Sequence, residues 1–430
     1  MTLKEKLREL DRSQAKIITP ESVRKTTPLD DLLGGNEQDG CFVVERRFAL
    51  HYPHGAVRLA SLHEISSAAL AIAGKDERLV ELDLAHALFL DTETTGLAGG
   101  TGTVAFLLGA GCFEGEEFVV RQYFLRQPCE EVAMLKRLQT LMEECKGLVT
   151  FNGKSFDIPL LRTRAVLHRL PVDFDRVPHF DVLHAARRLW KECVESCSLG
   201  ELENNVLQLR RSQDIPGALI PQIYFDFLRY GDATQLPEVF AHNRQDIVSM
   251  ATLLVRIAQL VQYPMRGLGA AVISPQELRR VAVLYRQLGN FAASARLFEE
   301  LLQQLRSTPN LEDHLALGLC YKSQRRYDKA NQIWREVIDR QPFHPLPYIE
   351  LAKYFEHREG ATQSALEWVE RALRNLLLSE ELNLRDGWLP YKNDLLHRKN
   401  RLLRKLARQP AINPDSPHWD PATSDPARKE

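Results

Sequence analysis

Two acidic residues stand at the end of an apolar run in the first quarter of the chain. The run 88–90 leads directly into Asp91, and Glu93 follows two positions later. Alternate side chains of a strand share one face, so both carboxylates would project together from the C-terminal end of that strand. A lone pair of this kind can also be ordinary solvated residues, because hard divalent cations need several convergent oxygens.

Two further carboxylates follow in helical contexts. Asp157 comes after the apolar run 147–151 and a turn signal, at the expected start of a helix. An acid in the first turn also stabilises the helix dipole, which is the structural alternative for Asp157. Asp246 lies in a strongly helical segment with His242 four residues before it, so the two side chains share a face. Taken alone, that pair would be an ordinary surface pair.

Together, the four carboxylates suit a hydrolytic site with two Mg²⁺ or Mn²⁺ ions. Asp91, Glu93, Asp157 and Asp246 would ligate the ions, which would hold a phosphodiester. One ion would activate water and the other would stabilise the leaving oxygen, so no nucleophilic side chain is required. His242 exchanges protons near pH 7 and would take the proton of the water as general base.

The elements that must position these residues alternate between strands and helices over residues 81–265. Three successive strand-like runs with short connections predict an antiparallel meander before the first helix. The pattern predicts an α/β domain whose mixed sheet begins with three antiparallel strands. Residues 1–80 are expected to form a partly ordered N-terminal preface.

Residues 270–380 are helical and repeat at an offset of 35 positions. Small residues recur in one column and large apolar residues three positions later: Ala295, Ala330 and Ala365, then Phe298, Ile333 and Trp368. This predicts an all-α domain of three tetratricopeptide-type helix pairs, whose usual role is to offer a concave surface to a protein partner. Coincidental spacing of three amphipathic helix pairs is the alternative.

Residues 381–409 are expected to form a basic C-terminal helix, and residues 410–430 a disordered tail rich in proline. Within it, residues 395–409 carry leucines on one face and a run of cations without acids on another. Such a run is either a solvated face or a phosphate-contacting one.

Composition excludes some classes of protein. The 56 Lys and Arg residues against 57 Asp and Glu residues leave a formal net charge of −1, so the whole chain is no polycation built to coat nucleic acid. Seven scattered cysteines predict a reducing compartment rather than a disulfide framework. Without a signal-like or membrane-spanning apolar run, we expect a cytoplasmic protein with no membrane partner.

The acidic motifs resemble the three exonuclease motifs of the DEDD superfamily, which has a ribonuclease H-like fold. They read DTETTGL from Asp91, FNGKSFDIPLL from Phe151 and HNRQDIVSM from His242. With SLGELENNVL and DIPGALIPQIYFDFLRYGD between them, residues 40–260 look like the YprB-type ribonuclease H-like family, whose members often carry C-terminal tetratricopeptide repeats. The resemblance implies a central mixed sheet, metal ligands at the four carboxylates and exonucleolytic cleavage from a 3′ end.

His242 departs from the pattern of the superfamily. DEDD enzymes with a catalytic histidine place it five residues before the last Asp, where this chain has Ala241, and those with a tyrosine place it four before. The change rotates a side chain by about 100° around a helix. His242 is therefore either the general base or a metal ligand, and Asn243 could equally orient water.

A single-stranded end of DNA or RNA is the expected substrate. Residues expected to contact it flank the acidic motifs or lie in the basic helix: Thr94, Gly96, Leu97, Asn152, Lys154, Asn243, Arg398, Arg401, Arg404 and Lys405. The prediction is a metal-dependent 3′ to 5′ exonuclease coupled to a partner-binding repeat. The alternative is a catalytically silent nuclease-like domain that serves as a nucleic-acid- or protein-binding adaptor.

Overall fold

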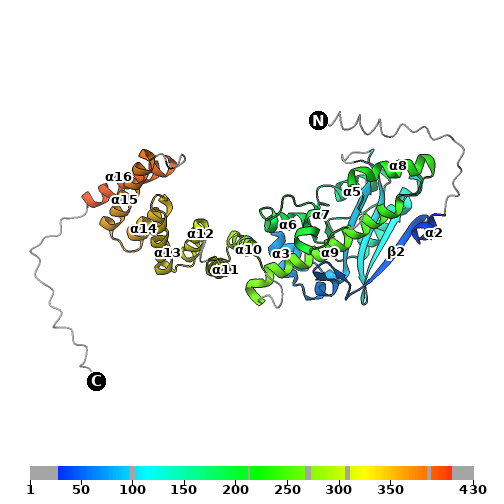
Figure 1. The fold of residues 1–430 in the computed structure, drawn as a ribbon, viewed down its shortest axis with the longest axis horizontal. Helices are drawn as coiled ribbons and strands as arrows, with labels where there is room; N and C mark the ends of the chain where they lie inside the picture. The colour runs from blue at the N-terminus through cyan, green and yellow to red at the C-terminus, as the bar shows by residue number, and fades with distance from the viewer. Residues whose placement is uncertain are drawn as a thin grey trace, which may run out of the picture. The chain divides into compact units, whose positions relative to one another are not determined.

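The chain forms two compact units, Met1–Leu284 and Tyr285–Glu430. Figure 1 shows a sheet with flanking helices in the first and a succession of helices in the second. The computed structural model describes residues 28–96, 102–211, 214–266, 273–305, 310–382, 384 and 389–408. Leu97 and the expected tail at 410–430 lie outside the described residues.

A seven-stranded mixed sheet organises the first unit, in the order β1-β2-β7-β6-β5-β8-β9. Its strands are β1 (Asn36–Gln38), β2 (Cys41–Ala49), β5 (Ala87–Thr94), β6 (Ala105–Glu114), β7 (Glu117–Phe124), β8 (Gly147–Thr150) and β9 (His179–Asp181). The meander β5-β6-β7 is antiparallel, whereas β8 runs parallel to both β5 and β9. The predicted mixed sheet with three antiparallel strands first is confirmed.

Strand β2 extends this sheet beyond the meander. It pairs antiparallel with β7 over its whole length, from Phe42 opposite Phe124 to Ala49 opposite Glu117. The segment belonged to the expected preface, but its first four residues are buried and join the sheet core. A separate two-stranded ribbon, β3 (Pro53–His54) with β4 (Val57–Arg58), follows it.

The helices of the first unit cover both faces of the sheet. A hydrophobic cluster joins Leu88 and Leu90 of β5 to residues of five helices. Phe106 of β6 stacks there on Tyr224, with ring centroids 4.0 Å apart. The helices of the unit are α2 (Leu29–Leu33), α3 (Ser67–Gly74), α4 (Glu131–Glu144), α5 (Asp157–Leu167), α6 (Val182–Trp190), α7 (Leu199–Leu202), α8 (Ile220–Tyr230) and α9 (Leu236–Arg266). Alternation along β5 leaves Asp91 and Glu93 on the other face.

Helix α9 runs along that other face of the sheet (Figure 1). It packs closely because β6 has glycines beneath it. A Cβ atom on Gly109 would lie 2.3 Å from Oδ1 of Asn243, and one on Gly111 would lie 2.6 Å from Cγ2 of Ile247. Leu236–Pro264 is long and apolar enough to cross a membrane. However, 72% of its most apolar stretch of 18 residues is buried within the protein. Packing on the sheet therefore accounts for its apolar character.

The remaining helices follow one another along the chain. They are α10 (Pro275–Gln287), α11 (Phe291–Gln304), α12 (Leu311–Ser323), α13 (Tyr327–Arg340), α14 (Pro345–His357), α15 (Thr362–Glu381) and α16 (Leu389–Ala407). The column of small residues, Ala295, Ala330 and Ala365, is buried as the repeat pattern predicts. The second unit begins at Tyr285, within α10. The α/β domain is thus followed by an all-α, tetratricopeptide-type domain.

Helix α16 packs on the repeats through Leu395 and Leu402, both fully buried. Two of its cations meet the same buried carboxylate: Arg398 donates to Glu356 at 3.4 Å and Arg401 at 2.5 Å. Arg398 and Arg401 thus share one carboxylate of the repeats, and Arg401 remains 47% exposed, so their contact with nucleic acid stays a prediction.

Candidate functional site

The four predicted carboxylates lie together at one edge of the sheet. Asp91 and Glu93 end β5, and Asp157 begins α5, which follows the neighbouring parallel strand β8. Parallel strands bring their C-terminal ends to the same edge, so the topology delivers these acids to one place. Asp246 reaches the same place from α9, which covers β5. The cluster is secluded, since the side chains of Glu93 and Asp246 are 13% and 15% exposed.

Electrostatic repulsion couples the carboxylates. Burial raises the pKa of Asp91 and of Glu93 well above the ordinary range, and the charge of Asp246 raises both further. Burial raises the pKa of Asp157 to about 6, although a hydrogen bond from Thr92 opposes the shift. The pKa of Asp246 is raised by burial as well, against the opposing charges of His242 and Arg211. The cluster thus carries more negative charge than its own surroundings neutralise.

Asp91 is held by a chain of buried amides. Asn243 donates from Nδ2 to Oδ2 of Asp91 at 2.8 Å and accepts at Oδ1 from Nε2 of Gln122 at 2.9 Å. Gln122 also donates to the carbonyl of Phe240 at 2.8 Å. Asn243 is fully buried. Its predicted contact with nucleic acid is therefore wrong: it positions Asp91 and cannot reach a strand.

Asp157 is fixed from the opposite face of β5. The hydroxyl of Thr92 donates to Oδ1 of Asp157. The turn before α5 is organised by Asp181, which accepts the backbone N–H of Asn152 at 3.0 Å and of Lys154 at 3.1 Å. Asn152 has a φ of 64°, a left-handed conformation that asparagine tolerates well. The side chain of Lys154 is exposed beside this turn, and its contact with nucleic acid stays a prediction.

The imidazole of His242 lies between the cluster and a fifth carboxylate. Its Nδ1 lies 2.6 Å from Oδ1 of Asp214, while Nε2 lies 3.5 Å from Oδ2 of Asp246 and 3.9 Å from Oε1 of Glu93. Helical spacing thus sets His242 beside Asp246, as predicted. Asp214 fixes the orientation of the ring, and Nε2 is the nitrogen directed at the acids.

Sequence reasoning missed an arginine that bridges the site. Arg211 donates from Nε to Oε2 of Glu203 at 2.5 Å and from Nη2 to Oδ1 of Asp246 at 2.5 Å. It also lies 3.1 Å from Oδ2 of Asp214. Glu203 is fully buried. No spacing rule connects these positions, and the only sequence signal was their occurrence in or beside the stretch SLGELENNVL.

The donor set fits divalent cations. Carboxylate oxygens are the ligands that Mg²⁺ and Mn²⁺ prefer, and burial followed by repulsion from the neighbouring acids raises the pKa of Asp91 and of Glu93. Within the described part of the chain, no three His, Cys, Asp or Glu side chains yet converge closely enough to hold an ion. One oxygen of Asp246 instead accepts a hydrogen bond from the guanidinium of Arg211.

The other predicted contacts with nucleic acid remain predictions. The hydroxyl of Thr94 donates to the carbonyl of Gly96 at 2.8 Å, which shapes the end of β5. Arg404 and Lys405 are exposed on α16.

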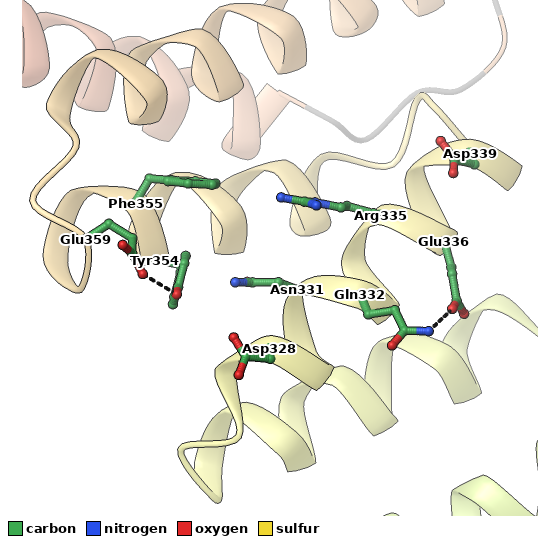
Figure 2. Close-up of a pocket in the computed structure, with 9 residues that line it drawn as sticks. All are labelled: Asp328, Asn331, Gln332, Arg335, Glu336, Asp339, Tyr354, Phe355 and Glu359. Carbon is green, nitrogen blue, oxygen red and sulfur yellow. Dashed lines mark hydrogen bonds between the residues drawn. The ribbon is translucent and has the colours of Figure 1, made fainter.

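A separate groove of about 450 Å³ lies between α13 and α14 in the second unit. Figure 2 shows Tyr354, Phe355 and Asn331 facing this groove. Its charged lining residues are four acids and one arginine: Asp328, Glu336, Asp339 and Glu359, with Arg335. The groove thus combines aromatic surface with negative charge.

Comparisons with known proteins agree with this architecture. A family model described as RNase H superfamily matches residues 88–258, which contain all four carboxylates. The uncharacterized protein YprB of Bacillus subtilis (strain 168) is 31% identical over 354 residues, which cover 78% of this chain and 81% of that protein.

Two solved structures show more distant similarity. The family B DNA polymerase of the archaeon Pyrobaculum calidifontis is 17% identical over 47% of this chain and 29% of its own, with a TM-score of 0.34. The match therefore spans less than a third of the polymerase. MamA of AMB-1 is 16% identical over 34% of this chain and 83% of its own, with a TM-score of 0.24. The identity and coverage shared with the Bacillus subtilis protein establish that this chain belongs to the YprB family, with an RNase H superfamily domain.

Proposed function

We propose that the protein is a metal-dependent nuclease that removes nucleotides from the 3′ end of a single strand. The observation that carries the proposal is the buried cluster of Asp91, Glu93, Asp157 and Asp246, whose pKa values are raised by burial and mutual repulsion. Such a cluster is costly for a fold to maintain, and binding of divalent cations offsets the cost.

The four carboxylates would hold two Mg²⁺ or Mn²⁺ ions, which would supply charge stabilisation and activation of water at the phosphodiester. Water attacks phosphorus, the bond from phosphorus to the 3′ oxygen of the preceding nucleotide breaks, and a nucleoside monophosphate leaves. The chain contributes the ligand geometry: Asn243 sets the rotamer of Asp91, and Thr92 sets that of Asp157.

His242 is proposed to receive the proton of the attacking water at Nε2. That nitrogen is directed at Glu93 and Asp246, whereas Nδ1 is held by Asp214. Nδ1 has two neighbours, Oδ1 of Asp214 at 2.6 Å and Nη1 of Arg211 at 3.2 Å. The proposal requires the tautomer in which Nδ1–H donates to the closer Asp214, because Nε2 then keeps the free lone pair of a general base.

The deciding experiment is cleavage of end-labelled single strands of DNA and RNA by the full chain in Mg²⁺, Mn²⁺ or EDTA. We expect metal-dependent shortening from the 3′ end, which a label at the 5′ end follows as a ladder. Blocking the terminal linkage with a phosphorothioate should slow it. A folded wild-type protein that cleaves neither strand in either metal would instead support the silent adaptor.

His242→Ala is expected to lower the cleavage rate by about a hundredfold or more, the size of a lost general base. Its affinity for Mn²⁺, measured by calorimetry, should stay close to that of the wild type. A large loss of Mn²⁺ affinity would identify His242 as a ligand instead. Replacing the exposed His51 with Ala provides the control, since that residue lies outside the cluster.

We further propose that the repeats recruit a protein partner and that the protein acts in the cytoplasm. The groove lined by Tyr354, Phe355 and acidic side chains supports the first proposal. The second is supported by the seven cysteines, all of which are free thiols in the fold. A reducing compartment keeps thiols in that state.

A further inference from the structure

Arg211 supplies the positive charge that lies against the acid cluster. Its Nη2 donates both to Oδ1 of Asp246 at 2.5 Å and to Oε1 of Glu203 at 2.8 Å. The arginine side chain is only 11% exposed. The carboxylate of Asp246 is therefore paired with a largely buried guanidinium rather than hydrated by bulk solvent.

Arg211 is held in place by Glu203, which is not one of the four carboxylates of the cluster. Nε and Nη2 together grip both oxygens of Glu203, whose side chain is 1% exposed. The hydroxyl of Ser249 also donates to Glu203, and Nε2 of Gln245 lies 3.4 Å from it. Bidentate pairing of this kind fixes a guanidinium strongly. Arg211 would consequently keep its place beside the site if Asp246 turned to another cation.

We infer that Arg211 is the internal counter-ion of the metal-free site and competes with divalent cations for Asp246. The inference rests on the proposed function, because it takes Asp246 as a metal ligand. An oxygen that accepts a hydrogen bond from a guanidinium at 2.5 Å must loosen that bond before it ligates an ion, and the two cations repel each other. Asp246 thus exchanges its hydrogen bond with Arg211 for a bond to the metal ion.

Direct titration of the full chain with Mn²⁺, by calorimetry or electron paramagnetic resonance, tests the exchange. Arg211→Gln should bind Mn²⁺ about tenfold more tightly than the wild type, because a unit charge next to the ligand is gone. Glu203→Gln should bind more weakly, since Arg211 then has only Asp246 and Asp214 as acidic partners. These opposite shifts are expected from two substitutions that each remove one charge.

Two further variants control for the loss of a buried ion pair. Arg211→Gln leaves Glu203 buried without its cation, so the double variant Glu203→Gln/Arg211→Gln removes both charges and should still bind more tightly than the wild type. Arg164→Gln breaks a pair of similar burial with Glu131, away from the cluster, and should leave Mn²⁺ affinity unchanged. Thermal unfolding of each variant shows whether the fold is kept.

The outcomes separate this inference from the proposed function. If the wild type binds Mn²⁺ and both folded arginine variants bind it equally or more weakly, Arg211 organises Asp246 and the competition is disproved. If neither the wild type nor either arginine variant binds Mn²⁺, the ligand set is wrong and the proposed function fails with the inference. Binding by the arginine variants alone would support competition in its strongest form.

Discussion

Asp91→Asn is expected to lower the rate of phosphodiester cleavage by about a thousandfold while making the metal-free protein more stable. The loss of rate follows from removal of one charged ligand, at the size usual for a deleted electrostatic contribution in an active site. The gain in stability follows from the raised pKa of Asp91, which burial and the nearby acids cause. Asn243 can still donate to the amide oxygen of the new side chain, so the local geometry is kept.

The raised pKa values determine whether stability rises or falls with pH. An acid with a raised pKa in the fold binds its proton more tightly there than in the unfolded chain. The stability of the metal-free wild type should therefore fall as pH rises from about 4, where an unfolded Asp ionises, through the raised values, of which that of Asp157 is about 6. Asp91→Asn removes one such contribution, so its advantage in stability over the wild type should grow as pH rises.

Denaturant unfolding in EDTA between pH 4.5 and pH 8 measures this difference. Asp175→Asn is the matched control, because the Arg162 guanidinium holds the pKa of that exposed carboxyl below its usual range. The control should cleave normally and gain no stability at high pH. Parallel pH profiles for the wild type and Asp91→Asn would contradict the electrostatic account of the cluster.

Gly109→Ala is expected to destabilise the first unit by about 1–3 kcal/mol, the usual cost of overpacking a core. The new Cβ would lie 2.3 Å from Oδ1 of Asn243 and 2.5 Å from Cδ1 of Ile247, so α9 must move away from the sheet. Because Asn243 holds Asp91 and α9 carries Asp246, cleavage should fall at least tenfold even where the protein remains folded.

Chemical denaturation and the cleavage assay together check this prediction. Gly200→Ala is the control, because its Cβ would meet nothing within 4 Å and the position is helical. It should be neutral or slightly stabilising, as alanine is favoured over glycine in helices. If Gly109→Ala matched it in both stability and rate, the close approach of α9 to β6 would not matter for the site.

The convergence of the acids could be predicted because it depends on local periodicity. Alternation along a strand places Asp91 and Glu93 together, and one helical turn places His242 beside Asp246. The burial of Asn243 had a signal as well: it falls on the apolar stripe that includes Val239 and Ile247, at spacings of four residues. That stripe predicts a core-facing side chain rather than one exposed to a strand.

The partners of the arginines could not be predicted. Arg211 meets Asp246 across 35 residues, and Arg401 meets Glu356 across 45, so each pair depends on how separate segments pack. The residues next to an arginine in the sequence do not indicate whether it will pair with a buried acid in the fold. For the same reason the sequence could not show that two arginines in the basic run of α16 pair with Glu356 of the repeats.

The order of the site residues along the chain has a consequence for synthesis. Asp91, Glu93 and Asp157 leave the ribosome well before α9, which brings Asp246 and covers the face of β5 that carries the first two acids. A nascent or truncated chain that stops before residue 236 would have three carboxylates but no helix to enclose them. On the proposed function, cleavage of nucleic acid would therefore arise only once the first unit is nearly complete.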